Sequence, residues 1–77
     1  MEYRVRDILR GVVHPESEEN LVDGGMVESI AADEQKITVA LRFRKARDPF
    51  ALKIKARVEQ LLKEEFSTHN VVVFVKE

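Results

Sequence analysis

The sequence predicts a small α+β domain with two layers, in which two helices lie on one face of a mixed three-stranded sheet in the order αββαβ. Apolar residues recur at helical spacing in two separate stretches. Residues 36–44 alternate between apolar and polar side chains, as in a half-buried strand, and an apolar run closes the chain. The 77 residues are enough for one domain, 1–77, with a single core.

The first helix is expected over Tyr3–Val13. Its apolar side chains follow the i, i+3, i+4, i+7, i+8 spacing of one helical face: Val5, Ile8, Leu9, Val12 and Val13. Pro15 disfavours helical backbone at the residue before it, His14. The helix should therefore end near Val13.

An acid-rich loop, His14–Gly25, is expected between this helix and the sheet. It closes with two adjacent glycines, which indicate a backbone position with φ > 0 or a close contact. Their spacing fits neither G-x-x-x-x-G-K-[ST] nor G-x-G-x-x-G, so a nucleotide phosphate loop is excluded. Met26–Ala32 and Lys36–Arg44 should then form an antiparallel hairpin.

A second helix is expected to open at Asp48 and Pro49. Aspartate suits the N-cap, and proline suits the first helical position. The buried stripe of this helix should comprise Ile54, Val58, Leu61, Leu62 and Phe66. Val71–Val75 should follow as a strand that is covered on both sides or paired centrally, parallel to the strand before the helix.

Composition excludes several classes of protein. The chain has no cysteine, which rules out disulfides, thiolate metal sites and thiol nucleophiles, and permits a reducing compartment. No stretch approaches the ~20 apolar residues of a membrane span, and the charged start does not resemble a signal peptide. We therefore expect a cytoplasmic protein without membrane contacts.

Charge is distributed unevenly although the net charge is only −1. His14–Glu34 holds seven acids and no Lys or Arg, whereas Arg42–Arg57 holds seven bases and one acid. This pattern is typical of two solvated faces, or of a dipolar surface that orients a partner protein. A nucleic-acid-binding module that uses the Arg42–Arg57 run is the alternative function. It is disfavoured because the exposed sheet face lacks paired aromatics and the chain has no GXXG loop.

The two histidines, His14 and His69, are the remaining candidates for chemistry. His14 lies close in sequence to Glu16, Glu18 and Glu19, which would allow a metal-binding loop as a second alternative. A simpler interpretation makes His14 a polar residue that ends the first helix and interacts with its negative end. Spacing connects neither histidine to a nucleophile. We therefore predict no catalytic residue, no resident cofactor and no resident metal.

The segment Asn20–Ile30 resembles the "N-I-V-x-x-G-x-V-x-x-I" core of the metal–sulfur cluster assembly factor family. These PaaD-like domains also stand at the N-terminus of Mrp-type P-loop ATPases. His14-Pro15-Glu16 stands where the family usually has Asp-Pro-Glu, and Asp48-Pro49 where many members have Cys-Pro. The resemblance covers essentially the whole chain.

The resemblance implies an accessory or adaptor role in iron–sulfur cluster assembly or delivery, exerted through protein contacts. Its partners would be assembly proteins, client proteins or a P-loop ATPase domain. Asp48 replaces the cysteine, so no thiolate is present to ligate a cluster. The implied contact region joins two loops: His14, Pro15, Glu16, Lys45, Arg47, Asp48 and Pro49. Asp48 would orient the turn, while Lys45 and Arg47 would attract an acidic partner.

Overall fold

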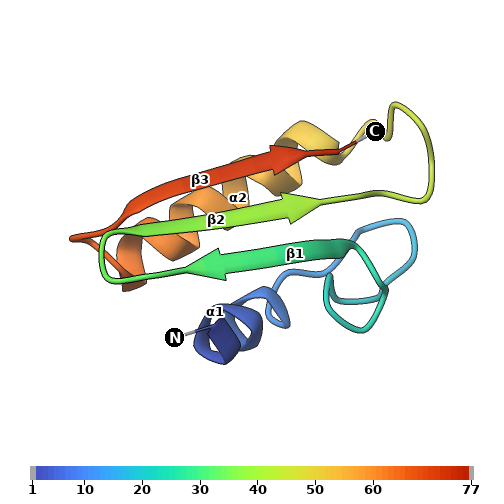
Figure 1. The fold of residues 1–77 in the computed structure, drawn as a ribbon. Helices are drawn as coiled ribbons and strands as arrows, with labels where there is room; N and C mark the ends of the chain where they lie inside the picture. Colours follow the sequence, from blue (N-terminus) through green and yellow to red (C-terminus); the bar gives the residue numbers. More distant parts are fainter. Residues whose placement is uncertain (1, 77) are drawn as a thin grey trace.

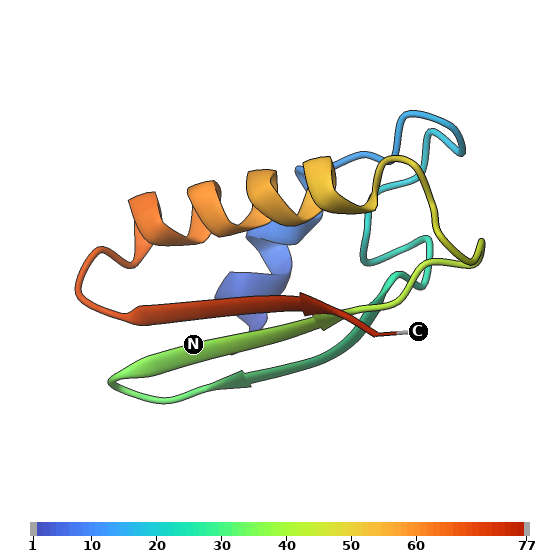
Figure 2. The same cartoon turned by 90° about the horizontal axis from the view of Figure 1, so that it is seen from above.

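The computed structural model of the chain describes residues 2–76. Its elements are α1 (Glu2–Leu9), β1 (Val27–Ala32), β2 (Lys36–Leu41), α2 (Ala51–Glu65) and β3 (Asn70–Val75) (Figure 1). This order, with both helices on one side of the sheet, confirms the predicted α+β class (Figure 2). Within residues 2–76, neither helix is long and apolar enough to cross a membrane.

The sheet is mixed, with strand order β1-β2-β3. β1 pairs antiparallel with β2, and β3 pairs parallel with β2, as the hairpin and the helical crossover predict. β2 is therefore the central strand. The prediction that the last strand is covered on both sides or central was wrong, because β3 lies at an edge and Phe74 is 42% exposed.

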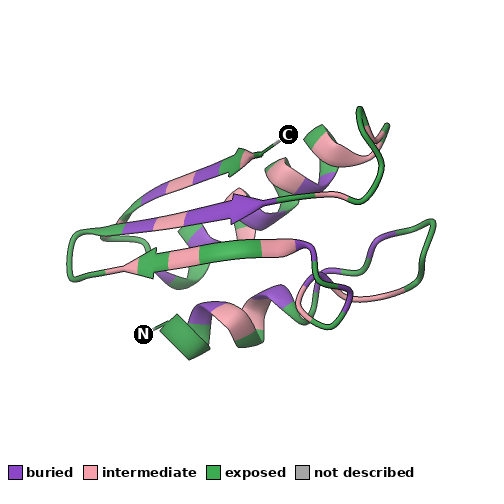
Figure 3. Cartoon of the chain, turned by 45° about the vertical axis from the view of Figure 1, so that its right-hand side comes forward, coloured by how far each residue is buried: buried purple, intermediate pink, exposed green. Residues whose placement is uncertain are grey.

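One core lies between the helices and the sheet. Alternate residues of β2 point into it, and Ile37, Val39 and Leu41 are fully buried. The other layers contribute a larger set: Val5, Leu9, Ile54, Val58, Leu62, Val71 and Val73. Figure 3 shows the buried segments of the sheet and the helices in purple. β2 ends at Leu41, before the predicted Arg44. Ala40 is 2% exposed although its alternation placed it on the solvent face, because β2 has a neighbour on each side.

α1 ends earlier than predicted, at Leu9 and not near Val13. The N–H groups of Gly11 and Val12 bond to carbonyls only three residues back, at 3.0 and 3.1 Å, so the chain tightens and turns there. Glycine is a poor helix former, which favours an end at this point. Val12 stays buried, but Val13 pairs with Asn20 in an isolated bridge and is 53% exposed.

α2 begins later than predicted, and Phe50, not Asp48, is its N-cap residue. The carboxylate of Asp48 accepts the Phe50 N–H at 2.8 Å, and its carbonyl accepts the Ala51 N–H at 3.1 Å. Asp48 thus closes the turn that leads into the helix, and Pro49 lies in that turn. The predicted buried stripe is otherwise confirmed, with Ile54, Val58, Leu62 and Phe66 buried and Leu61 half-buried.

The loop before β1 is closed by Asn20. Its side-chain oxygen accepts the N–H groups of Val22 and Asp23 at 3.0 and 2.9 Å, and its carbonyl accepts the Gly24 N–H at 2.9 Å. A Cβ on Gly24 would lie 2.9 Å from that carbonyl oxygen, while Gly25 has φ of +72°. The two glycines therefore meet different needs, a close contact at Gly24 and left-handed backbone at Gly25.

Candidate functional site

Two loops from distant parts of the sequence meet at one end of the domain. His14, in the loop after α1, and Asp48, in the loop between β2 and α2, lie 34 residues apart in sequence. Nε2 of His14 is 2.8 Å from Oδ2 of Asp48, and each side chain is only 5% exposed. The structure therefore brings together the two loop motifs whose proximity the resemblance implied.

The hydrogen bonds assign the tautomer of His14. The Glu16 N–H donates to Nδ1 of His14 at 3.1 Å, and because a backbone N–H can only donate, Nδ1 must be the unprotonated nitrogen. Nε2 then carries the proton and donates it to the carboxylate of Asp48. Both nitrogens of the ring therefore have hydrogen-bond partners.

The residues around Asp48 favour the ionised form of its carboxyl group. Burial raises the pKa of this carboxyl, but the N–H of Phe50, the hydrogen bond and electrostatic interaction with His14, and the positive charge of Lys45 outweigh it. The pKa of Asp48 therefore falls below its ordinary value of 3.8. Asp48 is therefore a buried carboxylate. One of its oxygens accepts from His14 on the other loop, and the other accepts from Phe50 on its own loop.

Aromatic rings surround the imidazole of His14. Its centroid is 5.5 Å from that of Phe50, in an edge-on arrangement, and 6.0 Å from that of Phe43. The backbone of His14 is also fixed, since its N–H donates to the Glu19 carbonyl and its carbonyl accepts from Glu18, both at 2.9 Å. The interpretation of His14 as a polar residue ending the first helix was therefore wrong.

Charged side chains of the two loops lie outside this buried pair. Lys45 is 4.0 Å from Glu16, and Arg44 is 3.4 Å from Glu19 and donates to the Gly24 carbonyl at 3.0 Å. Parts of the acidic and basic runs thus meet at this end of the molecule. Among the predicted contact residues, His14 and Asp48 are enclosed, and five are exposed: Pro15, Glu16, Lys45, Arg47 and Pro49.

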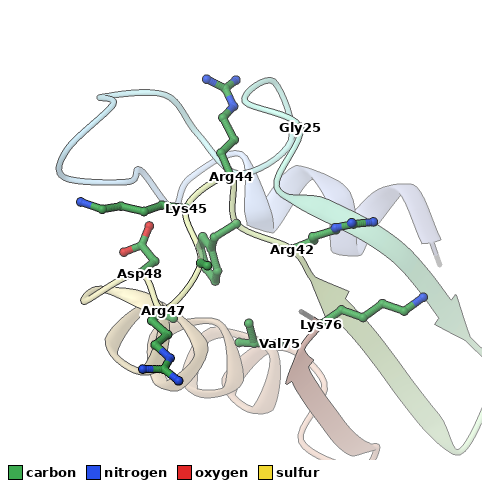
Figure 4. A pocket seen from close by; sticks show the side chains of 11 residues that line it. Gly25, Arg42, Arg44, Lys45, Arg47, Asp48, Val75 and Lys76 are labelled. Atoms are coloured by element: carbon green, nitrogen blue, oxygen red, sulfur yellow. The ribbon is translucent and has the colours of Figure 1, made fainter.

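Two hollows lie on either side of the loop between β2 and α2, residues 42–50. A small one of about 170 Å³ borders the His14–Asp48 pair and is also lined by Glu16, Ser17 and Met26. A groove of about 470 Å³ runs along the other side of the loop as far as the end of β3 (Figure 4). Lys76 and Val75 of this groove were not predicted as site residues, because only the parallel pairing of β3 with β2 brings them there.

We call the end of the domain where the His14 and Asp48 loops meet the corner. Its residues are not suited to bind a metal ion or to ligate an iron–sulfur cluster. Within residues 2–76, no group of three or more His, Cys, Asp or Glu side chains is placed to hold a metal ion. The alternative that combined His14 with the acidic loop lacks a free imidazole nitrogen, since both are hydrogen-bonded. Iron–sulfur clusters favour thiolates, and the chain has no cysteine.

Phe43 and Phe50 are the residues that sequence reasoning missed at this corner. Phe43 was assigned to the apolar face of a strand, which in fact ends at Leu41. Phe50 was given no role in the sequence analysis. The one signal for both was the presence of large aromatic residues in an otherwise polar segment.

Comparisons with known proteins agree with this description. A family model described as "Iron-sulfur cluster assembly protein" matches residues 2–73. A crystal structure of a domain of unknown function (DUF59) from Bacillus anthracis superposes with a TM-score of 0.87 at 22% identity, over 97% of this chain and 73% of that one. No curated protein gave a significant match.

A second similar structure is a solution structure from Mycobacterium tuberculosis. That protein is described as associated with [Fe-S] complex assembly and repair. It superposes with a TM-score of 0.64 at 22% identity, over 97% of this chain, and this chain spans 66% of its length. At this identity the two structures support the fold.

Proposed function

Because the chain belongs to the iron–sulfur cluster assembly protein family, we propose that it serves cluster assembly as an adaptor that docks other proteins at the His14–Asp48 corner. Family membership indicates the role in assembly. The docking mechanism is our inference, and the single observation that carries it is the 2.8 Å bond between the two loops. A buried bond between them joins the two loops into one surface of fixed shape.

In this proposal the iron–sulfur cluster is held by the partner proteins and not by this chain. Soft iron–sulfur clusters prefer thiolate ligands, and this chain offers none. The exposed groups of the corner are instead suited to contacts with protein: Glu16, Lys45 and Arg47 carry charge, and Pro15 and Pro49 give rigid apolar edges. The proposed partners are assembly or client proteins that hold the cluster themselves.

We further propose a non-enzymatic role in the cytoplasm. The His14–Asp48 pair resembles part of a catalytic triad, but its imidazole donates to the carboxylate through Nε2 and accepts a backbone N–H at Nδ1. Neither nitrogen is left to activate a nucleophile. The pair is therefore better suited to holding the loops than to proton transfer.

The adaptor exists in one of two forms, as a free-standing protein or as the N-terminal domain of an Mrp-type ATPase. The Asp48-Pro49 opening favours the second form through its resemblance to variants found in such domains. Sequencing the reading frame downstream of Glu77 distinguishes the two forms. A phosphate-binding loop there would identify the ATPase, with its nucleotide site outside these residues.

A deletion strain of the source organism tests the docking role. Activities of cluster-dependent enzymes should fall on deletion, and they should return with the wild-type gene. The double variant Lys45→Glu with Arg47→Glu alters only exposed side chains and should fail to restore them. Lys63→Glu, an exposed charge on α2, is the matched control and should restore them fully.

Two results would overturn the proposal. One is full restoration by the double variant, which would mean that the corner is not the contact. The other is a deletion strain in which the activities of cluster-dependent enzymes are unchanged while pathways that need no iron are affected. Immunoblots of both variants confirm equal protein levels, so that loss of folding is not mistaken for loss of contact.

A further inference from the structure

The groove beside the corner is strongly cationic. Five positive side chains line it: Arg42, Arg44, Lys45, Arg47 and Lys76. Figure 4 shows them around the hollow, on the β2–α2 loop and at the end of β3. Asp48 is the single acid among the lining residues, and its two oxygens already accept from His14 and from the Phe50 N–H.

These cations are exposed, and their ion pairs within the chain are long; Arg44 also donates to the Gly24 carbonyl at 3.0 Å. Arg42, Arg44, Lys45 and Lys76 have side chains that are 57% to 72% exposed. Their carboxylate neighbours, Glu16, Glu19 and Glu28, lie 3.4 to 4.0 Å away. Exposed pairs at such separations add little to stability, so an external carboxylate can replace them at small cost. Within residues 2–76, Arg47 has no carboxylate within the 4.0 Å limit of an ion pair.

The chain's own carboxylates indicate what the groove accepts. Glu28 reaches Arg42 and Lys76 together, each at 3.9 Å, while Glu19 reaches Arg44. Carboxylates of the chain itself, on the loop before β1 and on the edge strand β1, therefore already pair with these cations. An acidic partner would compete with these groups for the same cations.

The groove also has an apolar part to its lining, made of Phe43, Ala46, Ala51 and Val75. A side chain of moderate size can lie against these residues. A partner that combines carboxylates with an aliphatic residue would contact both the cations and the apolar residues of the groove. A nucleic acid would contact the cations, but the lining residues include only one aromatic, Phe43, which is itself packed against His14.

We propose that this groove binds an acidic polypeptide segment of a partner protein, whose carboxylates replace Glu16, Glu19 and Glu28 on the groove cations while an aliphatic side chain covers Val75. The inference rests on the proposed function and names the chemistry of the partner. It predicts that the acidic loop weakens partner binding, because Glu16 and Glu19 compete with the partner.

Fluorescence anisotropy with a labelled synthetic peptide tests this proposal. The probe is a ten-residue peptide of alternating Glu and Asp with one central Leu, and its matched control replaces every acid by Gln or Asn. The acidic peptide should bind the chain, and its affinity should fall steeply with added salt. The amide peptide should not bind.

Three variants locate the binding site. Arg47→Glu with Lys76→Glu should weaken the peptide about tenfold or more, because two attractions become repulsions. Glu19→Gln should strengthen it by a few fold, because a competitor is removed. Lys63→Glu, whose side chain is 61% exposed on α2 and does not line the groove, makes a similar change elsewhere and should leave the affinity nearly unchanged. Circular dichroism shows that each variant is folded.

Several outcomes would overturn the proposal: no binding of the acidic peptide, equal binding of the amide peptide, or equal losses from the groove variant and Lys63→Glu. Tighter binding of a single-stranded RNA of equal charge would also overturn it, in favour of a nucleic-acid groove. These outcomes are separable from failure of the adaptor role. Restoration of cluster-dependent enzymes in the deletion strain is measured without the peptide.

Discussion

The imidazole of His14 donates to the carboxylate of Asp48 across a 2.8 Å hydrogen bond that joins the two loops of the corner. The arrangement is polar at its centre and apolar around it, with the rings of Phe43 and Phe50 beside the imidazole. Hydrogen bonds of this kind are costly to break on one side only, because the partner is left buried and unsatisfied. The pair therefore controls the shape of the corner.

Asp48→Asn tests the direction of this bond. Nδ1 of His14 is fixed as an acceptor by the Glu16 N–H, so Nε2 must donate. The amide has a single acceptor oxygen, which cannot satisfy both Nε2–H and the Phe50 N–H. We expect the free energy of unfolding to fall by about 1–3 kcal/mol, measured by urea denaturation. Stability equal to wild type would contradict the assigned tautomer.

A second measurement follows the same carboxylate with pH. The pKa of Asp48 is lower in the folded chain than its ordinary value of 3.8, so the unfolded chain binds the proton more tightly. Its contribution to stability is therefore complete above that value and is lost as the pH falls through the lower folded pKa. The free energy of unfolding, measured from neutral pH down to about pH 2, should decline less steeply in Asp48→Asn.

Asp33 provides a comparison for this loss of stability at acid pH. Its carboxylate accepts the N–H groups of Gln35 and Lys36 at 2.7 and 2.8 Å in the turn between β1 and β2, and these bonds lower the pKa of Asp33. Asp33→Asn should therefore also make this decline less steep. A decline unchanged in either variant would show that other carboxylates dominate it.

The fold could be predicted from local patterns, because each element carries its own signal. The alternation of β2 and the stripe of α2 survive in the structure, since both are set by spacing along the chain. The errors occur where local signals compete. Gly11 ends α1 before Pro15 can act, and Asp48 lies in the turn before α2, where one carboxylate oxygen binds His14 and the other accepts the Phe50 N–H.

The site could be predicted only in part. Resemblance indicated that the two loops meet, but no local pattern predicts that His14 is buried or which nitrogen it donates from. Those properties depend on a tertiary contact between residues 34 apart. The groove has a similar origin, since Lys76 joins Arg42 only through the pairing of β3 with β2.

The glycine pair provides a prediction about the loop before β1. In Gly24→Ala the new Cβ would lie 2.9 Å from the Asn20 carbonyl oxygen and 2.7 Å from the Met26 side chain. The methionine can move, but the carbonyl is held by the Gly24 N–H at 2.9 Å. We expect a loss of about 1–3 kcal/mol in the free energy of unfolding, as for other overpacked sites.

Gly25→Ala separates backbone strain from crowding in the same loop. A Cβ at Gly25 meets no atom within 4 Å, but φ is +72°, so its cost is conformational, about 1–2 kcal/mol. Gly25→Asn should cost less, because asparagine tolerates left-handed backbone. Thermal unfolding of the three variants ranks the costs. A larger loss for Gly25→Asn than for Gly25→Ala would contradict the assigned conformation.

Arg47 is the last position to test, because it combines strain with exposure in the basic groove. Its φ is +56°, in the left-handed region that disfavours a side chain, and no carboxylate among residues 2–76 holds it there. Arg47→Gly removes the strain, so the free energy of unfolding should rise by about 0.5–1 kcal/mol. Binding of the acidic peptide should weaken, because a groove cation is lost.

Glu18 is the matched control, with φ of +61° and no place in the groove lining. Glu18→Gly should give a similar gain in stability, measured by urea denaturation, without weakening the peptide. If Arg47→Gly raises stability and lowers peptide affinity while Glu18→Gly only raises stability, the Arg47 side chain contributes to peptide binding although its backbone is strained. Equal affinities for wild type and Arg47→Gly would instead show that the Arg47 side chain has no part in binding.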